Sequence, residues 1–255
     1  MFEEIGSRVN RVLEEIGDIT ILFGKTLYNT LRGKFHVGNV FLQMVHVGVD
    51  SIGVSVVTAA FVGMVFAVQI ASEFVKFGAG SIVGGVMGIA VARELAPALT
   101  AVVLAARVGA AIAAEIGTMN VTEQVDAIYA MGSDPIKYLV VPRFLACTLM
   151  LPLLTIFADF VGFFGGFFVS VFVVGINQTG YMDSASAFLT TNDIIGGIIK
   201  AFFFGMIISI VGCYMGLKTK GGAKGVGEST TNSVVMSLVA IFVVNYFLSI
   251  IIFKR

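Results

Sequence analysis

The sequence predicts an all-α integral membrane protein, and three observations support this prediction. Hydrophobic residues make up 57% of the 255 residues and charged residues 13%, whereas soluble domains contain about 45–50% apolar residues. The mean hydropathy is +0.97. The apolar residues are gathered in long segments with few charges, each at least as long as the roughly 20 residues that an α-helix needs to cross a bilayer. We therefore expect one membrane domain, residues 1–255, with about five spanning helices.

Residues 1–34 are expected to form an amphipathic helix on the membrane surface. Apolar residues recur at helical spacing from Phe2 to Leu27, and the charged residues lie mostly on the other side. This pattern is typical of an interfacial helix rather than a span. The first span is expected at 51–72, which contains no charged residue.

The second span is expected at 80–113. Gly80, Gly84 and Gly88 recur at every fourth residue, a spacing that lets helix backbones approach closely in a membrane. Pro97 lacks a backbone N–H and is expected to kink this helix. We assign these four residues to helix packing.

Charged residues also lie within the second span. Arg93, Glu94 and Arg107 would together cost roughly 7–10 kcal/mol at mid-bilayer, so they are not expected to face lipid tails. Arg107 is close enough to the end of the helix for its side chain to reach the headgroups. For Arg93 and Glu94 two interpretations stay open. They either form ion pairs with another helix or line a cavity that accepts a polar headgroup.

A short polar helix is expected at 120–131, after the second span. Asn120 and Glu123 have the spacing of a capping box, and Gly132 and Pro135 end the helix. The helix is amphipathic, so it is suited to docking into a partner or lying on the membrane, although a connector without a partner fits equally well. Its apolar positions are Val121, Val125 and Ile128, and its polar positions are Glu123, Gln124 and Asp126.

The remaining chain alternates between apolar and polar segments. Asp159 is the one charge in the middle of the third span, and an acid in that position is a candidate proton site. We favour a hydrogen bond from Asp159 to a neighbouring helix, because no second acid lies beside it. Asp193 is expected to cap the fourth span. The spans are expected at 144–175, 194–217 and 234–253, with an outer loop at 175–193 and a flexible loop at 218–228.

The basic residues predict the orientation of the spans. Cytoplasmic segments usually carry the excess of Lys and Arg, and the larger group here includes the N-terminal segment. This distribution predicts an inner N-terminus and an outer C-terminus, with 120–131 and 218–228 in the cytoplasm. The inner group is Arg8, Arg11, Lys25, Arg32, Lys34, Lys137, Arg143, Lys218, Lys220 and Lys224, and the outer group is Lys76, Lys200, Lys254 and Arg255.

Several other classes of function are not expected. Lys and Arg together number 16, as do Asp and Glu, so there is no basic excess for binding nucleic acid. Cys147 and Cys213 lie in apolar runs without further ligands at metal-binding spacing, so neither a metal site nor a disulfide is expected. The sequence Gly24-Lys25-Thr26 matches the end of a phosphate-binding loop, but the glycine that such a loop needs five residues before Gly24 is replaced by Ile19. No hydrolase motif is present either. We therefore expect neither enzymatic activity nor a cofactor in this chain.

Two segments resemble the signature regions of a known family. The stretch ELAPALTAVVLAARVGAAIAAEIGTMNVTEQVDAIYAMGSDPIKYLVVPR, from Glu94 to Arg143, and GGAKGVGESTTNSVV, from Gly221 to Val235, are similar to the two marked segments of the MlaE (YrbE) permeases. With the apolar segments around them, they cover nearly the whole chain. The sequence departs from the family pattern at Asn120 and Asn232, where basic residues are common.

The resemblance implies a function and a set of partners. MlaE permeases are homodimeric membrane subunits of ABC transporters that move phospholipids between the inner and outer membranes of bacteria. A separate cytoplasmic ATPase would receive the 120–131 helix, a ring of periplasmic MCE-domain proteins would lie above the permease, and a small STAS-domain subunit is often present. The resemblance favours Arg93 and Glu94 as cavity-lining residues in a bacterial inner membrane protein. The residues expected to contact the ATPase are Asn120, Val121, Glu123, Gln124, Asp126 and Ile128.

Two other classes of function remain open. A proton-coupled secondary transporter would use Asp159, Glu94 and Arg107 as a proton relay. A scaffold that transports nothing would tolerate the neutralisation of all three charges. Inverted repeats would favour the secondary transporter, but five spans do not divide into two equal halves.

Overall fold

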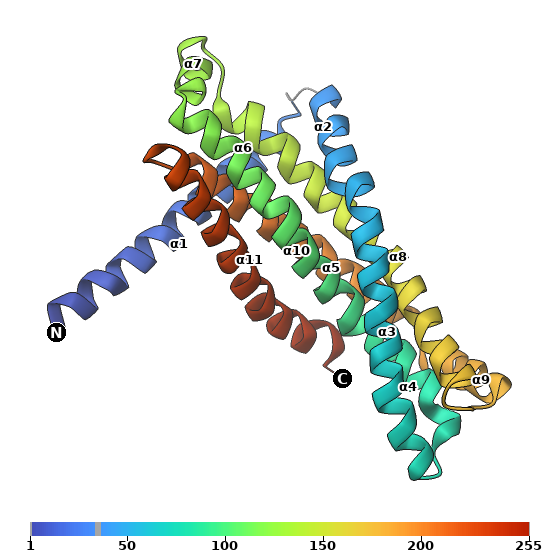
Figure 1. The fold of residues 1–255 in the computed structure, drawn as a ribbon. Coiled ribbons are helices and arrows are strands. Elements are labelled where there is room, and N and C mark those ends of the chain that lie inside the picture. The colour runs from blue at the N-terminus through green and yellow to red at the C-terminus, as the bar shows by residue number, and fades with distance from the viewer. Residues whose placement is uncertain (1, 34–36, 255) are drawn as a thin grey trace.

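The structure is a computed structural model that describes residues 2–33 and 37–254, and helices account for nearly all of these residues (Figure 1). Within these ranges there is no strand, and five helices are long and apolar enough to cross a membrane. The predicted fold class is therefore confirmed. The five helices are Val37–Lys76, Gly80–Val121, Ile136–Phe172, Thr191–Leu217 and Gly222–Phe253.

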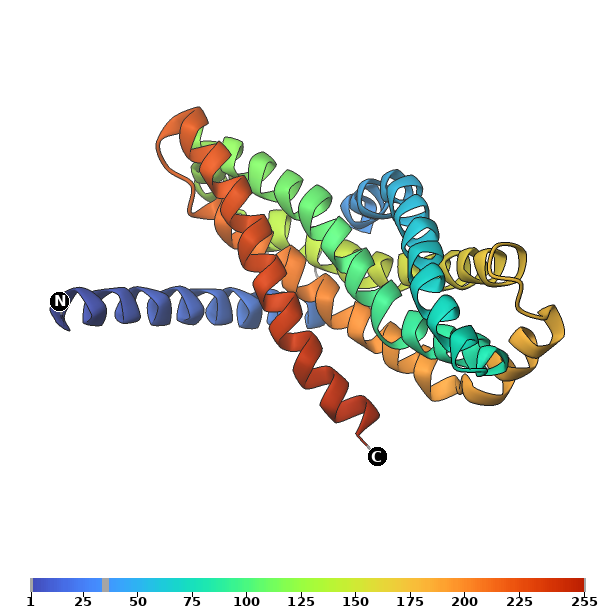
Figure 2. The same ribbon diagram turned by 60° about the horizontal axis from the view of Figure 1, so that its bottom comes forward.

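The N-terminal helix α1 (Phe2–Leu31) runs across the direction of the spans, and its N-terminal end projects away from the bundle (Figures 1 and 2). Its C-terminal half is anchored by Leu22, which is buried, and by Phe23, whose ring centroid lies 6.1 Å from that of Phe144. Some side chains on which the sequence predictions rest lie outside the described part of the structure. From the apolar stripe these are Phe2, Ile5, Val9 and Val12, and from the basic residues that predicted the orientation they are Arg8, Arg11, Lys34 and Arg255.

The first span is longer than the predicted 51–72. It consists of α2 (Val37–Met44), the π-helical turn η1 (Val45–Val49) and α3 (Asp50–Lys76). Forty residues of helix extend about 60 Å, twice the roughly 30 Å thickness of the hydrocarbon core. The helix is therefore longer than the membrane requires, and the prediction ended at 51 and 72 because the charged residues Asp50 and Glu73 bound the uncharged stretch.

The second span also extends beyond the predicted 80–113, as far as Val121. Two π-helical turns interrupt it, and such turns are frequent at functional sites. Its successive segments are η2 (Gly80–Ile82), α4 (Val83–Ala90), η3 (Val91–Leu95), α5 (Ala96–Leu104), η4 (Ala105–Gly109) and α6 (Ala110–Val121), of which η3 and η4 are the π-helical turns.

Helix α4 packs against a helix in the segment that was predicted to be an outer loop. That helix, α9 (Gln178–Phe188), begins after Asn177, whose side chain accepts a hydrogen bond from the Thr179 N–H at 2.9 Å. A Cβ atom on Gly84 would lie 1.9 Å from the Tyr181 carbonyl oxygen, whereas the contacts available at Gly88 are of ordinary length and Gly80 lies nearest Val75. Of the three predicted packing glycines, Gly84 is the one that the α4–α9 contact requires.

The last three spans are η5 (Ile136–Val140) with α8 (Val141–Phe172), α10 (Thr191–Leu217) and α11 (Gly222–Phe253). Helices α8 and α10 lie at the centre of the bundle and contact most of the other spans (Figures 1 and 2). Helix α10 begins with a capping box in which Thr190 is the N-cap and Asp193 the third helical residue, so Asp193 contributes to the cap from inside the helix.

The loop predicted at 218–228 is much shorter in the structure. Helix α11 begins at Gly222, so only the four residues from Lys218 to Gly221 connect it to α10. Gly221 and Gly222 have positive φ angles of 86° and 65°, which glycine adopts without steric cost. Gly221 and Gly222 therefore form a tight turn, and the other two glycines of the segment, Gly225 and Gly227, lie in the first turns of α11.

Candidate functional site

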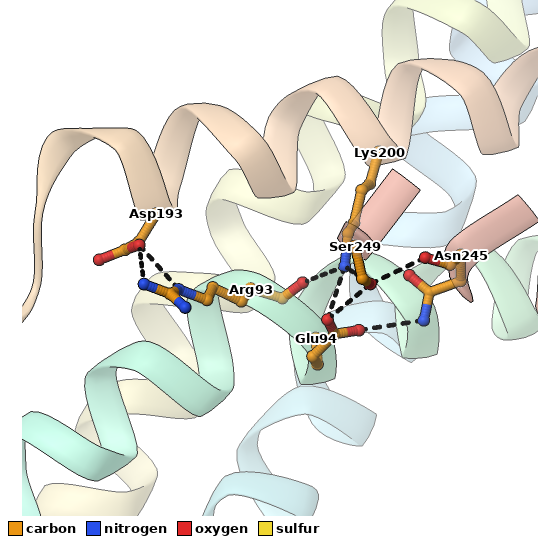
Figure 3. Close-up of polar contacts among 6 residues, drawn as sticks. All are labelled: Arg93, Glu94, Asp193, Lys200, Asn245 and Ser249. Atoms are coloured by element: carbon orange, nitrogen blue, oxygen red, sulfur yellow. Dashed lines mark hydrogen bonds and ion pairs between the residues drawn. The ribbon is translucent and has the colours of Figure 1, made fainter. Parts of the chain in front are cut away.

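The two charged residues in the middle of the second span belong to a polar network that joins three spans (Figure 3). Arg93 and Glu94 lie in the π-helical turn η3, and their partners come from α10 and α11. The network lies nearer the α9 end of the bundle than the α7 end. Its six residues are Arg93, Glu94, Asp193, Lys200, Asn245 and Ser249.

Because of Pro97, the carbonyl oxygen of Arg93 in this turn is available to accept a hydrogen bond from a side chain. In an α-helix the N–H of residue 97 would bond the carbonyl of residue 93, but proline has no N–H. Lys200 of α10 donates a hydrogen bond to the Arg93 carbonyl oxygen at 2.9 Å. Proline and the π-helical turn thus expose an acceptor, and a buried ammonium group satisfies it.

Lys200 is completely buried, yet its ammonium group has a full set of partners. Besides the Arg93 carbonyl, it donates to Glu94 Oε1 at 2.7 Å and to Ser249 Oγ at 2.8 Å. An ammonium group has three hydrogen-bond donors, so none of them is left over. This arrangement makes a charged lysine tolerable inside a membrane helix bundle.

Both carboxylate oxygens of Glu94 are also paired. Oε1 lies 2.7 Å from Lys200 Nζ and 2.9 Å from Ser249 Oγ, and Oε2 accepts a hydrogen bond from Asn245 Nδ2 at 3.0 Å. The Asn245 Oδ1 atom, in contrast, is buried and has no hydrogen-bond partner within residues 2–33 and 37–254. The site therefore retains one unused acceptor beside the ion pair.

Arg93 forms the second ion pair of the network. Its Nε and Nη2 atoms both lie 2.7 Å from Asp193 Oδ1, and the Asp193 side chain is 2% exposed. The Phe253 ring at the end of α11 covers the network, with its centroid 4.7 Å from Arg93 Cζ and 5.1 Å from Lys200 Nζ. The arginine and the lysine balance the glutamate and the aspartate, so the four groups are neutral together.

Of the two interpretations of Arg93 and Glu94, the structure therefore shows ion pairs with another helix. Their side chains are nevertheless 35% and 44% exposed, while Lys200 and Asp193 behind them are buried. Neither residue lines the open groove that runs between α1, α10 and α11. One side of each group remains open, so the network can present both charges to a polar ligand while its buried partners hold it in place.

The sequence interpretation did not find the partners of this site. Lys200 was assigned to an outer segment, although it lies within the fourth span. The available signal was a lysine at the seventh position of the predicted span 194–217, together with a glutamate in the second span for which the sequence alone showed no partner. Asn245 and Ser249, at positions i and i+4 of α11, gave a weaker signal because single polar residues are common in spans.

The polar helix between the second and third spans lies at the opposite end of the bundle. Helix α7 (Gln124–Ala130) packs Val125 and Ile128 against a small apolar cluster that includes Leu139. The other face is exposed and includes Gln124 and Asp126, and the side chains of Tyr129 and Met131 are 72% and 74% exposed. The helix thus presents acidic, aromatic and apolar groups together.

The start of this helix differs from the prediction. Helix α6 continues through Asn120 and Val121, and the N-cap of α7 is Glu123 in a left-handed conformation with φ 61°, without a side-chain capping bond. The Asn120 side chain instead donates hydrogen bonds to the carbonyl oxygens of Leu217 and Thr219, at 3.0 and 2.9 Å. Asn120 therefore ties the end of the second span to the turn after the fourth and does not cap α7.

Comparison with known proteins identifies the family. The family model described as "Permease MlaE" matches residues 40–251. This chain belongs to the MlaE permease family. It is 51% identical to a probable ABC transporter permease protein of Synechocystis sp. over 91% of this chain and 89% of the relative. It is 40% identical to a probable ABC transporter permease protein of Rickettsia bellii, over 98% and 96% of the two chains.

A plant relative shows that the family is not confined to bacteria. The protein TRIGALACTOSYLDIACYLGLYCEROL 1, chloroplastic, of Arabidopsis thaliana is 44% identical over 92% of this chain and 67% of the relative. As an MlaE permease, the chain is a multi-pass membrane subunit of a transporter of the ABC permease type and is not itself a catalytic enzyme.

Two further charges that were predicted within the spans of this MlaE permease, Arg107 and Asp159, have no hydrogen bond to that network in the described part of the chain. Arg107 donates hydrogen bonds to Ser51 Oγ and to the His46 carbonyl oxygen, near the start of α3. Both carboxyl oxygens of Asp159 are buried, and neither has a partner among the described residues. The predicted hydrogen bond from Asp159 to a neighbouring helix is therefore not formed. Within residues 2–33 and 37–254, no hydrogen bond joins Asp159, Glu94 and Arg107 into the relay that a proton-coupled mechanism would use.

We expect Asp159→Leu to leave the purified permease as stable as the parent protein or more stable. A buried polar group without a partner contributes a desolvation cost and no compensating bond, so its removal can be neutral or favourable. The midpoint of thermal unfolding in detergent measures this effect, with Asp159→Asn as the variant of matched shape. A loss of several degrees in the leucine variant alone would show that the carboxyl group has a partner in the assembled protein.

Proposed function

We propose that this permease is the transmembrane subunit of an ABC transporter that moves phospholipids between the inner and outer membranes, driven by a separate ATPase subunit. The observation that carries the proposal is the separation of two surfaces on one bundle. One end presents the exposed face of α7, and the membrane interior holds the partly exposed pair Arg93 and Glu94. In the proposed mechanism, the ATPase pushes on α7 and changes the helix packing around the pair.

The basic residues support an orientation with α7 in the cytoplasm. Lys200 lies inside a span and no longer counts among the outer residues, which strengthens the predicted imbalance. With α7 inside, α9 and the C-terminus face the periplasm. We place the protein in the bacterial inner membrane, where the α9 side is available to a ring of MCE-domain proteins and the α7 side to the ATPase and a small STAS-domain subunit.

We further propose that the functional permease is a homodimer. Helix α11 is attached to the bundle by one narrow stripe that includes Ser233, Ser237 and Ile241, and most of its surface is uncovered. Its C-terminal part exposes Phe242, Tyr246, Phe247 and Ile251. An aromatic surface of this kind, adjacent to the Glu94 network, is suited to contact with a second copy. The lipid cavity would then lie between the two copies, with Arg93 and Glu94 contacting the headgroup.

The test of this function is a pull-down of the tagged permease from its native membranes in mild detergent. We expect a Walker-motif ATPase to co-purify in equal amount and the eluate to hydrolyse ATP. After reconstitution, it should transfer labelled phospholipid to acceptor vesicles only when ATP is present. A permease that elutes without a nucleotide-binding subunit would contradict the proposal, and so would lipid transfer driven by a pH gradient alone.

A further inference from the structure

A second feature of the membrane region lies away from the Glu94 network. An open groove of about 1200 Å³ runs between α1, α10 and α11, in the half of the bundle nearer α7. Ligand pockets usually have volumes of about 300–1000 Å³, so this groove has room for a ligand larger than most. Its walls are mainly apolar and include Ile19, Phe203, Ile207, Val239, Ala240 and Val243.

Polar groups are concentrated at the α7 end of the groove. Glu15, Lys218, Ser229 and Asn232 line it there. Asn232 is exposed and lies in the segment whose family pattern usually has a basic residue. The groove is therefore amphipathic along its length, with apolar walls at the depth of the spans and charged groups near the membrane surface.

Lys218 is positioned to bind an anion at this end. Its ammonium group donates to the Tyr214 hydroxyl at 2.7 Å and lies 3.8 Å from Glu15 Oε1, and its side chain is 51% exposed. The hydrogen bond to Tyr214 raises the pKa of Lys218 above its ordinary value, so the group is charged at neutral pH. Because an ammonium group has three donors, Lys218 can bind a further acceptor without losing the contact with Tyr214.

Glu15 gives the same end of the groove a negative group. Its side chain is 33% exposed, and its distance from Lys218 is at the upper limit of a direct ion pair. A ligand with one anionic and one cationic group can therefore be placed with its charges opposed to those of the two side chains. A purely apolar surface on a second protein copy would cover Glu15 and Lys218 without offering either side chain a further polar partner.

We propose that this groove binds one zwitterionic phospholipid from the leaflet on the α7 side, with its acyl chains along α10 and α11. Its phosphate contacts Lys218 and Asn232, and its cationic headgroup contacts Glu15. The anchoring of α1 by Leu22 and Phe23 keeps the third wall of the groove in place. The proposal depends on the membrane location of the chain and not on its ATPase partner, so the two proposals can fail independently.

The absence of tryptophan from the sequence allows a direct test. Phe203→Trp places a single fluorophore in the groove, and Phe160→Trp places one on the exposed surface of α8 as a matched control. Dibrominated phosphatidylethanolamine, which quenches tryptophan on contact, is added to the purified full-length protein in detergent. We expect saturable quenching of Phe203→Trp at about one lipid per chain, and no quenching of Phe160→Trp at that ratio.

Variants at the polar end test the headgroup contacts. In the Phe203→Trp background, Lys218→Ala should weaken lipid binding about tenfold or more, because a hydrogen bond to a charged group is lost. Lys224→Ala removes an 89% exposed lysine outside the groove and should have no effect. Dibrominated phosphatidylglycerol, which lacks the cationic group, should bind more weakly than phosphatidylethanolamine.

Several results would overturn the proposal. Equal quenching of Phe203→Trp and Phe160→Trp would show a general lipid annulus, and equal binding of the two lipids would exclude recognition of a zwitterion. An unquenched Phe203→Trp would show that the groove is covered, for example by a second copy. If Phe203→Trp does not fold, Val239→Trp on α11 places the fluorophore on the facing wall, with the same expected results.

Discussion

Replacing Lys200 by methionine will lower the thermal stability of the permease more than any exposed substitution. The ammonium group is completely buried and has three partners, and its loss affects two of them most, because the Ser249 hydroxyl keeps its contacts with Glu94 and with the Asn245 carbonyl. Glu94 keeps its charge without the opposing cation, and the Arg93 carbonyl loses the donor that compensates for Pro97. Breaking a buried ion pair by removing one partner costs about 3–5 kcal/mol. The partial exposure of Glu94 places this case near the lower end.

A loss of about 3 kcal/mol corresponds to a decrease of roughly 6–12 °C in the unfolding midpoint for a chain of this size. Thermal unfolding in detergent, followed by circular dichroism, measures the decrease. Lys224→Met is the matched control, because Lys224 is 89% exposed and its nearest acidic partner is 3.9 Å away. We expect that control to unfold at the temperature of the parent protein.

The double variant Glu94→Gln, Lys200→Met separates the ion pair from the packing around it. Removing both charges leaves no unpaired ion, and replacing a whole buried pair is often neutral or stabilising. The double variant should therefore recover much of the stability that Lys200→Met loses. If the double variant is as unstable as the single variant, the loss comes from the methionine or from the Arg93 carbonyl and not from the unpaired charge of Glu94.

The sequence was sufficient to locate Arg93 and Glu94 as a candidate site but not to predict their partners. Arg93 and Glu94 stood out because charges are costly in an apolar segment, and their position in the chain was correct. Their partners lie about 100 and 150 residues away, on α10 and α11. Which faces of three helices meet depends on close contacts such as that of Gly197 with the Ala92 carbonyl, and helix periodicity alone does not determine them.

The ends of the helices were also predicted less well than the existence of the spans. Hydropathy located the five spans because the bilayer imposes their length. It did not show that the first span begins at Val37, because the charged residue Asp50 interrupts the apolar signal, nor that α6 continues to Val121, because its last turns contain Thr118 and Asn120. At Asn120 the local capping pattern competed with a tertiary contact. The side chain bonds the carbonyls of Leu217 and Thr219, which the sequence around 120 does not reveal.

The exposed face of α7 gives the second large expected effect, in the binding of the ATPase subunit. Asp126→Lys reverses a charge that stands opposite the buried positions Val125 and Ile128, and Tyr129→Ala removes an aromatic side chain that is 72% exposed. Aromatic residues dominate many interfaces, and such anchors are often worth about 2 kcal/mol or more. Tyr129→Ala should therefore weaken ATPase binding about 30-fold, and the combination with Asp126→Lys should abolish co-purification.

Neither change should unfold the spans, because the packing side of α7 is untouched. Asp126 lies in the first turn of α7, where a lysine loses about 0.3–1 kcal/mol of favourable interaction with the helix dipole, too little to disrupt the bundle. Glu73→Lys, at the other end of the bundle, reverses an exposed charge and should leave the ATPase bound. Ile128→Asp should instead dislodge α7 from Leu139 and release the ATPase through misfolding, visible as a lower unfolding midpoint. If Asp126→Lys with Tyr129→Ala retains the full amount of ATPase, α7 is a connector and the ATPase binds to another surface of the permease.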